Sequence, residues 1–248
     1  MSSLARNAAY VNNLPRYALG IVFLIFGIDK FVGFDSYLAW FEATDRAKIL
    51  TSNLDASTFI YAMGVVEVTL AILLLVGIFV RKTAVATSTA LVAILAVAQY
   101  PSSFPQDLGL LGTSIMLVFA SKDQRTSGLY YQFPKLARFG LSSVLVLWAA
   151  DHLLYTSTHV SWLQLFNLTV RNMPAEQVFV FVIMIGIIEL VIGSMIASGK
   201  LRVYPYIASA VFFVIAFLIL APPLNNYQSV GLAIISSWMI YITKYRQA

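Results

Sequence analysis

Glu67 is a carboxylate set inside an apolar run, and this position makes it the first candidate for chemistry in the chain. The run, GVVEVTLAILLLVGIFVRK, covers residues 64–82. A charge at the centre of a membrane costs about 2.5 to 3.5 kcal/mol on insertion scales. We therefore expect Glu67 to face neighbouring helices and to be paired or protonated. Asp29 and Lys30 lie near the end of the preceding apolar run, where the Lys30 side chain could reach Glu67 or turn outward. We predict Glu67 as the proton-exchanging catalytic residue and Asp29 and Lys30 as ligand-binding residues.

Gln99, Asp107 and Trp40 are the other candidate ligand-binding residues of this half of the chain. Gln99 and Asp107 border the same region from the third and fourth apolar runs, and Trp40 lies in the segment after the first. A structural interpretation stays open beside the functional one. Carboxylates inside a bundle also lock helices together through hydrogen bonds, and tryptophan is enriched at membrane interfaces.

The pattern around Glu67 occurs a second time, 122 positions further along the chain. Glu67 aligns with Glu189, and the residues in the places of Asp29 and Lys30 are Asp151 and His152. The same offset aligns further pairs: Arg16 with Arg138, Trp40 with Trp162, Gly64 with Gly186, Gly77 with Gly199, Gly109 with Gly231 and Ser114 with Ser236. Polar residues that are costly in lipid recur in register, so we infer a tandem duplication. Asp151, His152 and Glu189 are the second-repeat counterparts of the first site.

The composition is that of a membrane protein and excludes several kinds of chemistry. Hydrophobic residues make up 60% of the 248 residues and charged residues 11%, against about a quarter charged in soluble domains. The chain has no cysteine, so disulfides and thiolate metal sites are excluded, and its two histidines leave little material for a bis-histidine haem. We therefore predict no intrinsic cofactor and no metal site. The net charge of +5 is interpreted as a signal of membrane orientation, and not of nucleic-acid binding.

The elements that must hold these residues are transmembrane helices, because apolar runs of about 20 residues span a ~30 Å hydrocarbon core. The expected spans are 14–34, 58–80, 83–100, 105–121, 135–155, 178–198, 203–220 and 226–243. Short interfacial helices are expected within residues 36–50 and 159–170. The predicted fold class is an all-α integral membrane protein with eight transmembrane helices, arranged as two parallel four-helix bundles from an internal repeat. The predicted domains are a cytoplasmic lead at 1–13, repeat 1 at 14–122, a cytoplasmic linker at 123–135 and repeat 2 at 136–244.

The distribution of basic residues predicts the orientation. Twelve lie on the side of the termini: Arg6, Arg16, Arg81, Lys82, Lys122, Arg125, Lys135, Arg138, Lys200, Arg202, Lys244 and Arg246. The opposite side has four: Lys30, Arg46, Lys48 and Arg171. Cytoplasmic loops carry the excess of Lys and Arg, so we expect a multi-pass plasma-membrane protein with both termini in the cytoplasm.

The first repeat resembles the DoxX-like family of four-helix membrane proteins. The resemblance is carried by an opening pattern and a second-helix pattern: Arg16, Gly20, Phe23, Gly27, Lys30 and Phe31, then Gly64, Glu67, Gly77, Arg81 and Ala84. A third stretch, Asp107 to Gly112, is similar to the start of the family's fourth helix. Repeat 2 departs from the pattern, with Ser142 in place of Gly20 and Ala149-x-x-His152 in place of Gly-x-x-Lys. The resemblance implies a quinone-linked redox setting, as in a subunit of thiosulfate:quinone oxidoreductase.

Three functions stay open at this point. The first is a membrane subunit of a respiratory or other redox complex that binds quinone near Glu67, contacts the lipid bilayer and protein partners, and takes its electrons from a partner. Enzymatic activity, if present, would then be part of a quinone-linked oxidoreductase. The second is a proton-coupled small-molecule transporter, favoured by the duplication and the intramembrane carboxylates. The third is a structural or assembly subunit, which the small residues of the third helix, such as Ala84 and Ser88, would suit.

Overall fold

The computed structural model describes most of the chain as helices, with one small pair of strands. The described residues are 10–43, 55–97, 104–122, 129–130, 132–166, 170–199, 203–220 and 227–245. The helices of the first repeat are α2 (Leu14–Val32), α3 (Phe34–Ala43), α5 (Ala56–Val76), α6 (Val80–Val97) and α7 (Phe104–Val118). Those of the second are α8 (Lys135–Leu154), α9 (Thr156–Phe166), α10 (Ala175–Ser198), α11 (Tyr204–Leu220) and α12 (Gln228–Tyr245). The prediction of an all-helical fold is confirmed.

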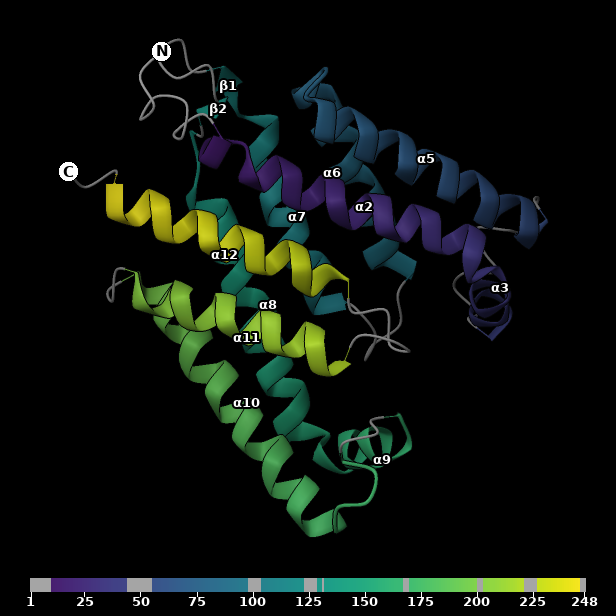
Figure 1. Ribbon diagram of the computed structural model, residues 1–248, viewed down its shortest axis with the longest axis vertical. Coiled ribbons are helices and arrows are strands. Elements are labelled where there is room, and N and C mark those ends of the chain that lie inside the picture. The colour runs from purple at the N-terminus through teal and green to yellow at the C-terminus, as the bar shows by residue number, and fades with distance from the viewer. Residues whose placement is uncertain are drawn as a thin grey trace.

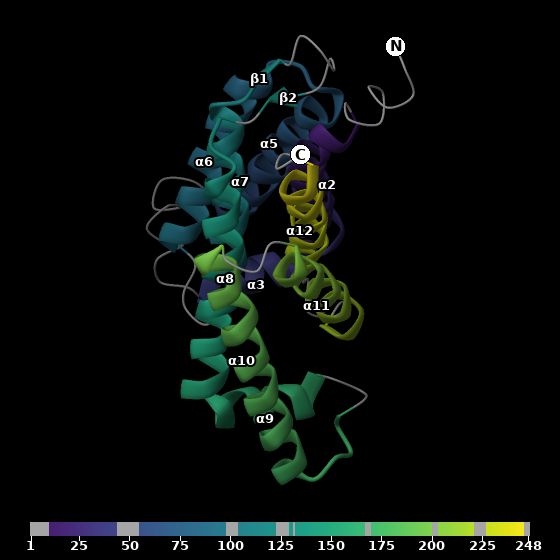
Figure 2. The ribbon, with the colours of Figure 1, turned by 90° about the vertical axis from the view of Figure 1, so that its left-hand side faces the viewer.

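Two-residue strands accompany the linker between the repeats. β1 (Ser121–Lys122) and β2 (Leu129–Tyr130) pair in antiparallel register, with Ser121 opposite Tyr130 and Lys122 opposite Leu129. In Figures 1 and 2 this pair lies on the same side of the molecule as the start of α2 and the end of α12, and α3 and α9 lie away from it.

The boundary between α5 and α6 differs from the prediction, which ended the second helix at Val80. α5 ends at Val76 because Gly77 takes the left-handed conformation, with a φ of 86°, and its N–H bonds the carbonyl of Leu73 at 2.9 Å. Glycine adopts this conformation without the steric cost that a Cβ brings. The equivalent Gly199 ends α10 in the same way, with a φ of 65°.

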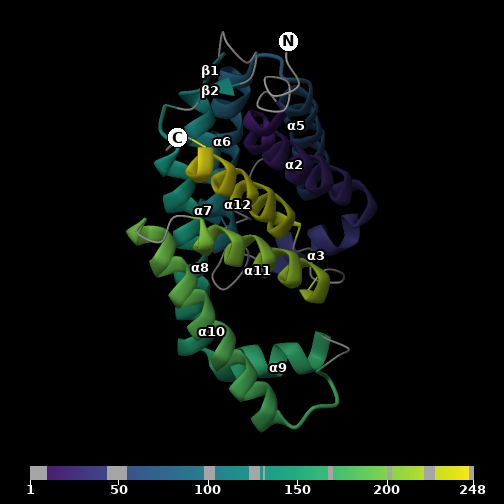
Figure 3. The same cartoon turned by 60° about the vertical axis from the view of Figure 1, so that its left-hand side comes forward.

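Helices of the two repeats share one hydrophobic core. Gly109 of α7 and Gly231 of α12 mark where the repeats meet, because a Cβ on either would overlap side chains of the other repeat. A Cβ at Gly109 would lie 2.6 Å from Leu232 and from Val144, and one at Gly231 would lie 2.6 Å from Val22. The last helix of each repeat therefore packs on the first helix of the other, and the predicted pair of bundles is joined through α2, α7, α8 and α12. Figure 3 shows α12 lying across α7 and α8.

Hydroxyl groups join the last two long helices of each repeat. Ser114 of α7 donates to the carbonyl of Ala84 on α6 at 3.0 Å and accepts from Ser88 at 2.9 Å. In repeat 2 the hydroxyls of Ser209 on α11 and Ser236 on α12 lie 3.0 Å apart. Ser114 and Ser236 are 122 positions apart, whereas their partners Ser88 and Ser209 are 121 apart, so only the residues of α7 and α12 keep the offset seen in the sequence.

Two of the described helices, α5 with 21 residues and α10 with 24, are long and apolar enough to cross a membrane by length and composition. In each, only 33% of the most apolar stretch is buried within the protein. The core helix of a soluble protein would bury most of such a stretch, whereas these present large side chains such as Val66, Ile72, Ile187 and Ile188 to the outside. The other described helices are shorter or more polar: α7 has 15 residues, and α2 contains Arg16, Asp29 and Lys30. Eight membrane crossings stay a prediction.

Candidate functional site

The first candidate site forms at a close contact between α2 and α5. Gly27 and Gly64 permit the approach, because a Cβ on Gly27 would lie 3.0 Å from the carbonyl oxygen of Gly64 and 2.7 Å from the side chain of Val68. Three residues after each glycine come Lys30 and Glu67. The close contact of the two backbones therefore brings their side chains together between the helices.

Lys30 and Glu67 form a buried ion pair. The Nζ of Lys30 donates to Oε2 of Glu67 at 2.6 Å, and the two side chains are 8% and 5% exposed. Two charges removed from water are tolerated when they neutralise each other at hydrogen-bonding distance. The sequence left open whether Lys30 reaches Glu67 or turns outward, and in the structure it reaches Glu67. The proton-exchanging role of Glu67 stays a prediction.

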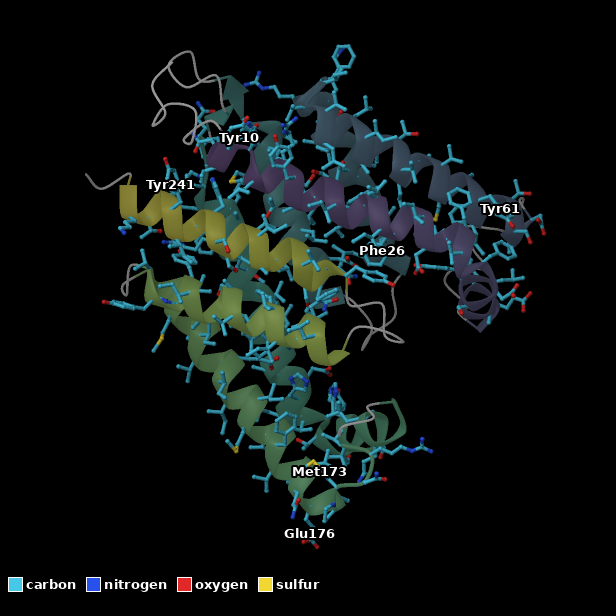
Figure 4. All side chains as sticks on the ribbon, viewed as in Figure 1. Tyr10, Phe26, Tyr61, Met173, Glu176 and Tyr241 are labelled. Carbon is cyan, nitrogen blue, oxygen red and sulfur yellow. The ribbon has the colours of Figure 1, made fainter. Side chains whose placement is uncertain are left out.

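Aromatic rings lie around the ammonium group of Lys30. Its Nζ lies 4.9 Å from the ring centre of Tyr37 and 5.7 Å from that of Phe26, within the range of cation–π attraction. The rings of Phe26 and Tyr227 pack in a T-shaped contact, with 5.9 Å between the ring centres, and Tyr227 lies just before α12. Figure 4 shows Phe26 between α2 and the near end of α12. A residue of repeat 2 therefore lies beside the site of repeat 1.

Asp29 is held by the phenol of Tyr37 from α3. The hydroxyl of Tyr37 donates to Oδ2 of Asp29 at 2.9 Å. Burial raises the pKa of Tyr37 above its usual range, and the negative charge of Asp29 raises it further. The phenol of Tyr37 is thus kept protonated and serves as a hydrogen-bond donor to a carboxylate or to an oxygen-bearing ligand.

The second repeat builds the same arrangement with different side chains. Nδ1 of His152 lies 2.7 Å from Oε2 of Glu189, and Nε2 of His159 lies 2.7 Å from Oδ2 of Asp151. These four residues are the counterparts of Lys30, Glu67, Tyr37 and Asp29 at the offset of 122. Asp151, His152 and Glu189 are predicted from the sequence, whereas His159 and its counterpart Tyr37 are not. Their shared register could have revealed them, because both are polar ring side chains placed eight residues after an aspartate.

The departures of repeat 2 from the DoxX-like pattern are compensated across the α8–α10 contact. Ser142, in the place of Gly20, donates to the carbonyl of Gly193 at 2.9 Å. Gly193 stands where repeat 1 has Ala71, so the small residue has moved to the partner helix. The contact between the helices is kept, and the side chain that would crowd it makes a hydrogen bond.

Of the other predicted ligand-binding residues, the structure describes the side chain of Asp107 only. Asp107 is buried in the first turn of α7, a helix that contacts α2. Gln99 lies outside the described residues, and Trp40 belongs to α3 but its side chain, like that of Trp162 on α9, is outside the described part. The ligand-binding roles of these residues stay predictions. Among the residues that the structure describes, no group of three or more His, Asp or Glu side chains is arranged to hold a metal ion.

Comparison with known proteins relates the first part of the chain to a membrane-associated family. The two helices that are long and apolar enough to cross a membrane, each with only 33% of its most apolar stretch buried, are compatible with a membrane protein. The DoxX family model matches residues 13–99, from the start of α2 to the end of α6. This part of the chain is therefore similar to the DoxX family, which is membrane-associated. No curated protein and no solved structure matches the chain.

Proposed function

We propose that this protein is a multi-pass membrane subunit of a respiratory or other redox complex and binds a quinone beside Lys30 and Glu67. The observation that supports it most is the ion pair of these two residues, which is buried among the rings of Phe26 and Tyr37. A quinone head group is flat and apolar on its faces, and its two carbonyl oxygens accept hydrogen bonds. Aromatic rings suit the faces, while the ammonium of Lys30 and a phenol suit the oxygens.

The residues of this site would handle the protons of quinone chemistry. Reduction of a quinone to a quinol takes up two electrons and two protons. Glu67 exchanges a proton across its 2.6 Å hydrogen bond with Lys30, and Asp29 with Tyr37 forms a second donor–acceptor pair. The electrons come from a redox protein bound as a partner. Lys30 donates to the reacting oxygen and stabilises the negative charge that develops there.

We also propose how the whole chain is arranged in the membrane. Eight helices cross the plasma membrane, four per repeat, and the two repeats are parallel because an even number of crossings returns the chain to its starting side. Both termini and the 123–135 linker lie in the cytoplasm, and α3 and α9 lie at the outer interface. The separation of the strand pair from α3 and α9 in Figure 1 supports this arrangement.

A titration with decylubiquinone tests the site. The protein is purified, placed in lipid nanodiscs, and followed by quenching of its own aromatic fluorescence, with wild type compared with Glu67→Gln and Tyr37→Phe. Both substitutions keep the size of the side chain, and binding is expected to weaken roughly tenfold, as for loss of a hydrogen bond to a charged group. Glu42→Gln is the matched control, since Glu42 is an exposed carboxylate of the same repeat. Equal affinities in all four proteins would contradict the proposal.

A proton-coupled transporter is the second candidate, and one observation favours it. Each repeat places an acidic and a basic side chain at the same position between its first and second long helix, as expected of a pathway lined by two related halves. In proteoliposomes this function predicts uptake of a substrate that depends on an imposed proton gradient. Uptake that ignores the gradient would exclude it. If neither quinone binding nor uptake is found, the structural or assembly role is left.

A further inference from the structure

The two histidines of the chain meet in repeat 2, and this cluster has no equivalent in the chemistry proposed for repeat 1. The ring centres of His152 and His159 lie 4.6 Å apart. Each imidazole also bonds its own carboxylate at 2.7 Å, Glu189 for His152 and Asp151 for His159. Lys30 and Tyr37 occupy the corresponding places in repeat 1. Of these side-chain types, only imidazole has an ordinary pKa near neutral pH.

The cluster runs from partly exposed groups to a fully buried one. The side chains of His152 and His159 are 21% and 19% exposed, Asp151 is 5% exposed, and Glu189 is completely buried. Oε1 of Glu189 has no hydrogen-bond partner among the described residues. An unpaired carboxylate oxygen in such a place is costly while the group is ionised, and protonation removes that cost. The buried end of the cluster is thus suited to accept a proton that enters at the imidazoles.

Other titratable side chains lie on the helices of this cluster and on those packed against them. α9 carries none besides His159; α8 also carries Lys135 and Arg138 at its start, and α10 also carries Glu176 in its first turn. Of the other helices packed on α8, α7 carries Asp107 and α12 carries Lys244. Burial lowers the pKa of His159, the nearby charge of His152 lowers it further, and Asp151 opposes both. The two imidazoles therefore influence each other's protonation.

We propose that His159, Asp151, His152 and Glu189 form one proton-binding site, through which a proton passes from the membrane interface to the buried carboxylate of Glu189. An imidazole at the interface takes the proton from water. When the proton is on His152, Nδ1–H points at Oε2 of Glu189, and transfer along that hydrogen bond leaves a neutral imidazole and a protonated carboxyl group. The two groups lose their opposite charges together, and the net charge of the pair does not change. The site does not depend on quinone binding by repeat 1.

Nitrogen NMR of the histidines tests the coupling directly, because the chain contains only these two histidines. Full-length protein labelled with ¹⁵N-histidine in nanodiscs is titrated from pH 8 to pH 5, and both imidazoles are expected to respond to the same protonation step. His152→Gln removes one charge and is expected to move the titration of His159 to higher pH by roughly one unit, as for coupled groups. Two independent titrations, with His159 unchanged in His152→Gln, would overturn the proposal.

Infrared difference spectra locate the proton acceptor. On acidification, a carbonyl stretching band of a protonated carboxyl group is expected to grow together with the imidazole change. It should be lost in Glu189→Gln and kept in Glu176→Gln, an exposed carboxylate on the same helix. A band that survives in Glu189→Gln would overturn the assignment.

Two further variants test the imidazoles with side chains that repeat 1 already carries at the equivalent positions, so that loss of the band is not simply the result of misfolding. They are His152→Lys and His159→Tyr. Both variants are expected to fold, and the double variant, which has no imidazole, is expected to lose the band over this pH range. A band that persists in the double variant would also count against the site.

Discussion

Both side chains of the Lys30–Glu67 ion pair are buried, so each charge depends on the other for its stabilisation. Removing one partner leaves the other charge buried without compensation, whereas replacing both with apolar groups also removes the cost of burying the charges. The pair is therefore tested better by single and double substitution together than by either alone.

We predict that Lys30→Met lowers the free energy of unfolding by about 3 to 5 kcal/mol. Thermal unfolding in detergent, followed by circular dichroism, measures the effect. The double variant Lys30→Met/Glu67→Leu should recover most of the lost stability, because no charge is left behind. A double variant as unstable as the single one would show that the pair is not buried as described.

Stability is also predicted to fall on acidification because of His159. Burial and the charge of His152 hold the pKa of His159 below its ordinary value of 6.5. Between the two values the unfolded chain binds more protons than the native one, so stability is lost as pH falls through about 6.5 toward the native value. His159→Tyr should flatten this part of the curve of unfolding temperature against pH. An equal slope in both proteins would contradict the assignment.

At the residue scale, the sequence predicted the charged members of the site but not their aromatic surroundings. Glu67 and Lys30 stand out because a charge in an apolar run demands a partner, and only a few partners exist. Phe26, Tyr37 and Tyr227 carry no such signal, since aromatic residues are common in membrane helices and at interfaces. Tyr227 in particular reaches the site through the packing of α12 on α2, a contact between repeats that local sequence does not encode.

Helix ends and helix contacts set the geometry of both sites at the scale of elements. α5 and α10 end at Gly77 and Gly199, and the arginine of the preceding long helix lies against each glycine. Arg16 and Arg138 are therefore placed at the carboxyl ends of these helices, where a positive charge is favoured by the helix dipole. The predicted boundary at Val80 was wrong because the apolar pattern continues through Ile78 and Phe79, while the backbone conformation is decided by Gly77.

Gly77→Ala is expected to destabilise the protein by more than the 1 to 2 kcal/mol that a left-handed alanine costs. The reason is that a Cβ at this position would overlap the guanidinium of Arg16. Combining Gly77→Ala with Arg16→Ala isolates the two causes: the overlap disappears, and the loss beyond that of Arg16→Ala alone should fall to the backbone cost. Chemical denaturation in mild detergent gives both values. A fully tolerated Gly77→Ala would contradict the described turn.

At the scale of the whole molecule, the duplication makes the two repeats equivalent in position but different in chemistry. The constant offset predicted the number and order of the long helices, since each expected span has a counterpart among α2, α5, α6, α7, α8, α10, α11 and α12. It did not predict that the repeats share a core. Gly109 and Gly231 are in register, but only the folded chain shows that each packs against the other repeat.

Membrane orientation is testable without background, because the chain has no native cysteine. Single cysteines are introduced at Ser36 on α3, Ser157 on α9 and Lys82 on α6, all exposed positions. A maleimide that does not cross membranes should label the first two from outside intact cells and Lys82→Cys only in inverted vesicles. Labelling of Ser36→Cys and Ser157→Cys from opposite sides would show inverted repeats and contradict the parallel arrangement.

The quinone content of the purified protein tests the central claim most directly. Wild type and Glu67→Gln are extracted from native membranes in mild detergent, and the quinones and proteins that copurify are measured by mass spectrometry. We expect quinone and a redox partner with the wild type, each in stoichiometric amount, and loss of the quinone with retention of the partner in Glu67→Gln. Wild-type protein that carries only bulk lipid, or a quinone content that Glu67→Gln does not change, would contradict the assignment of this site.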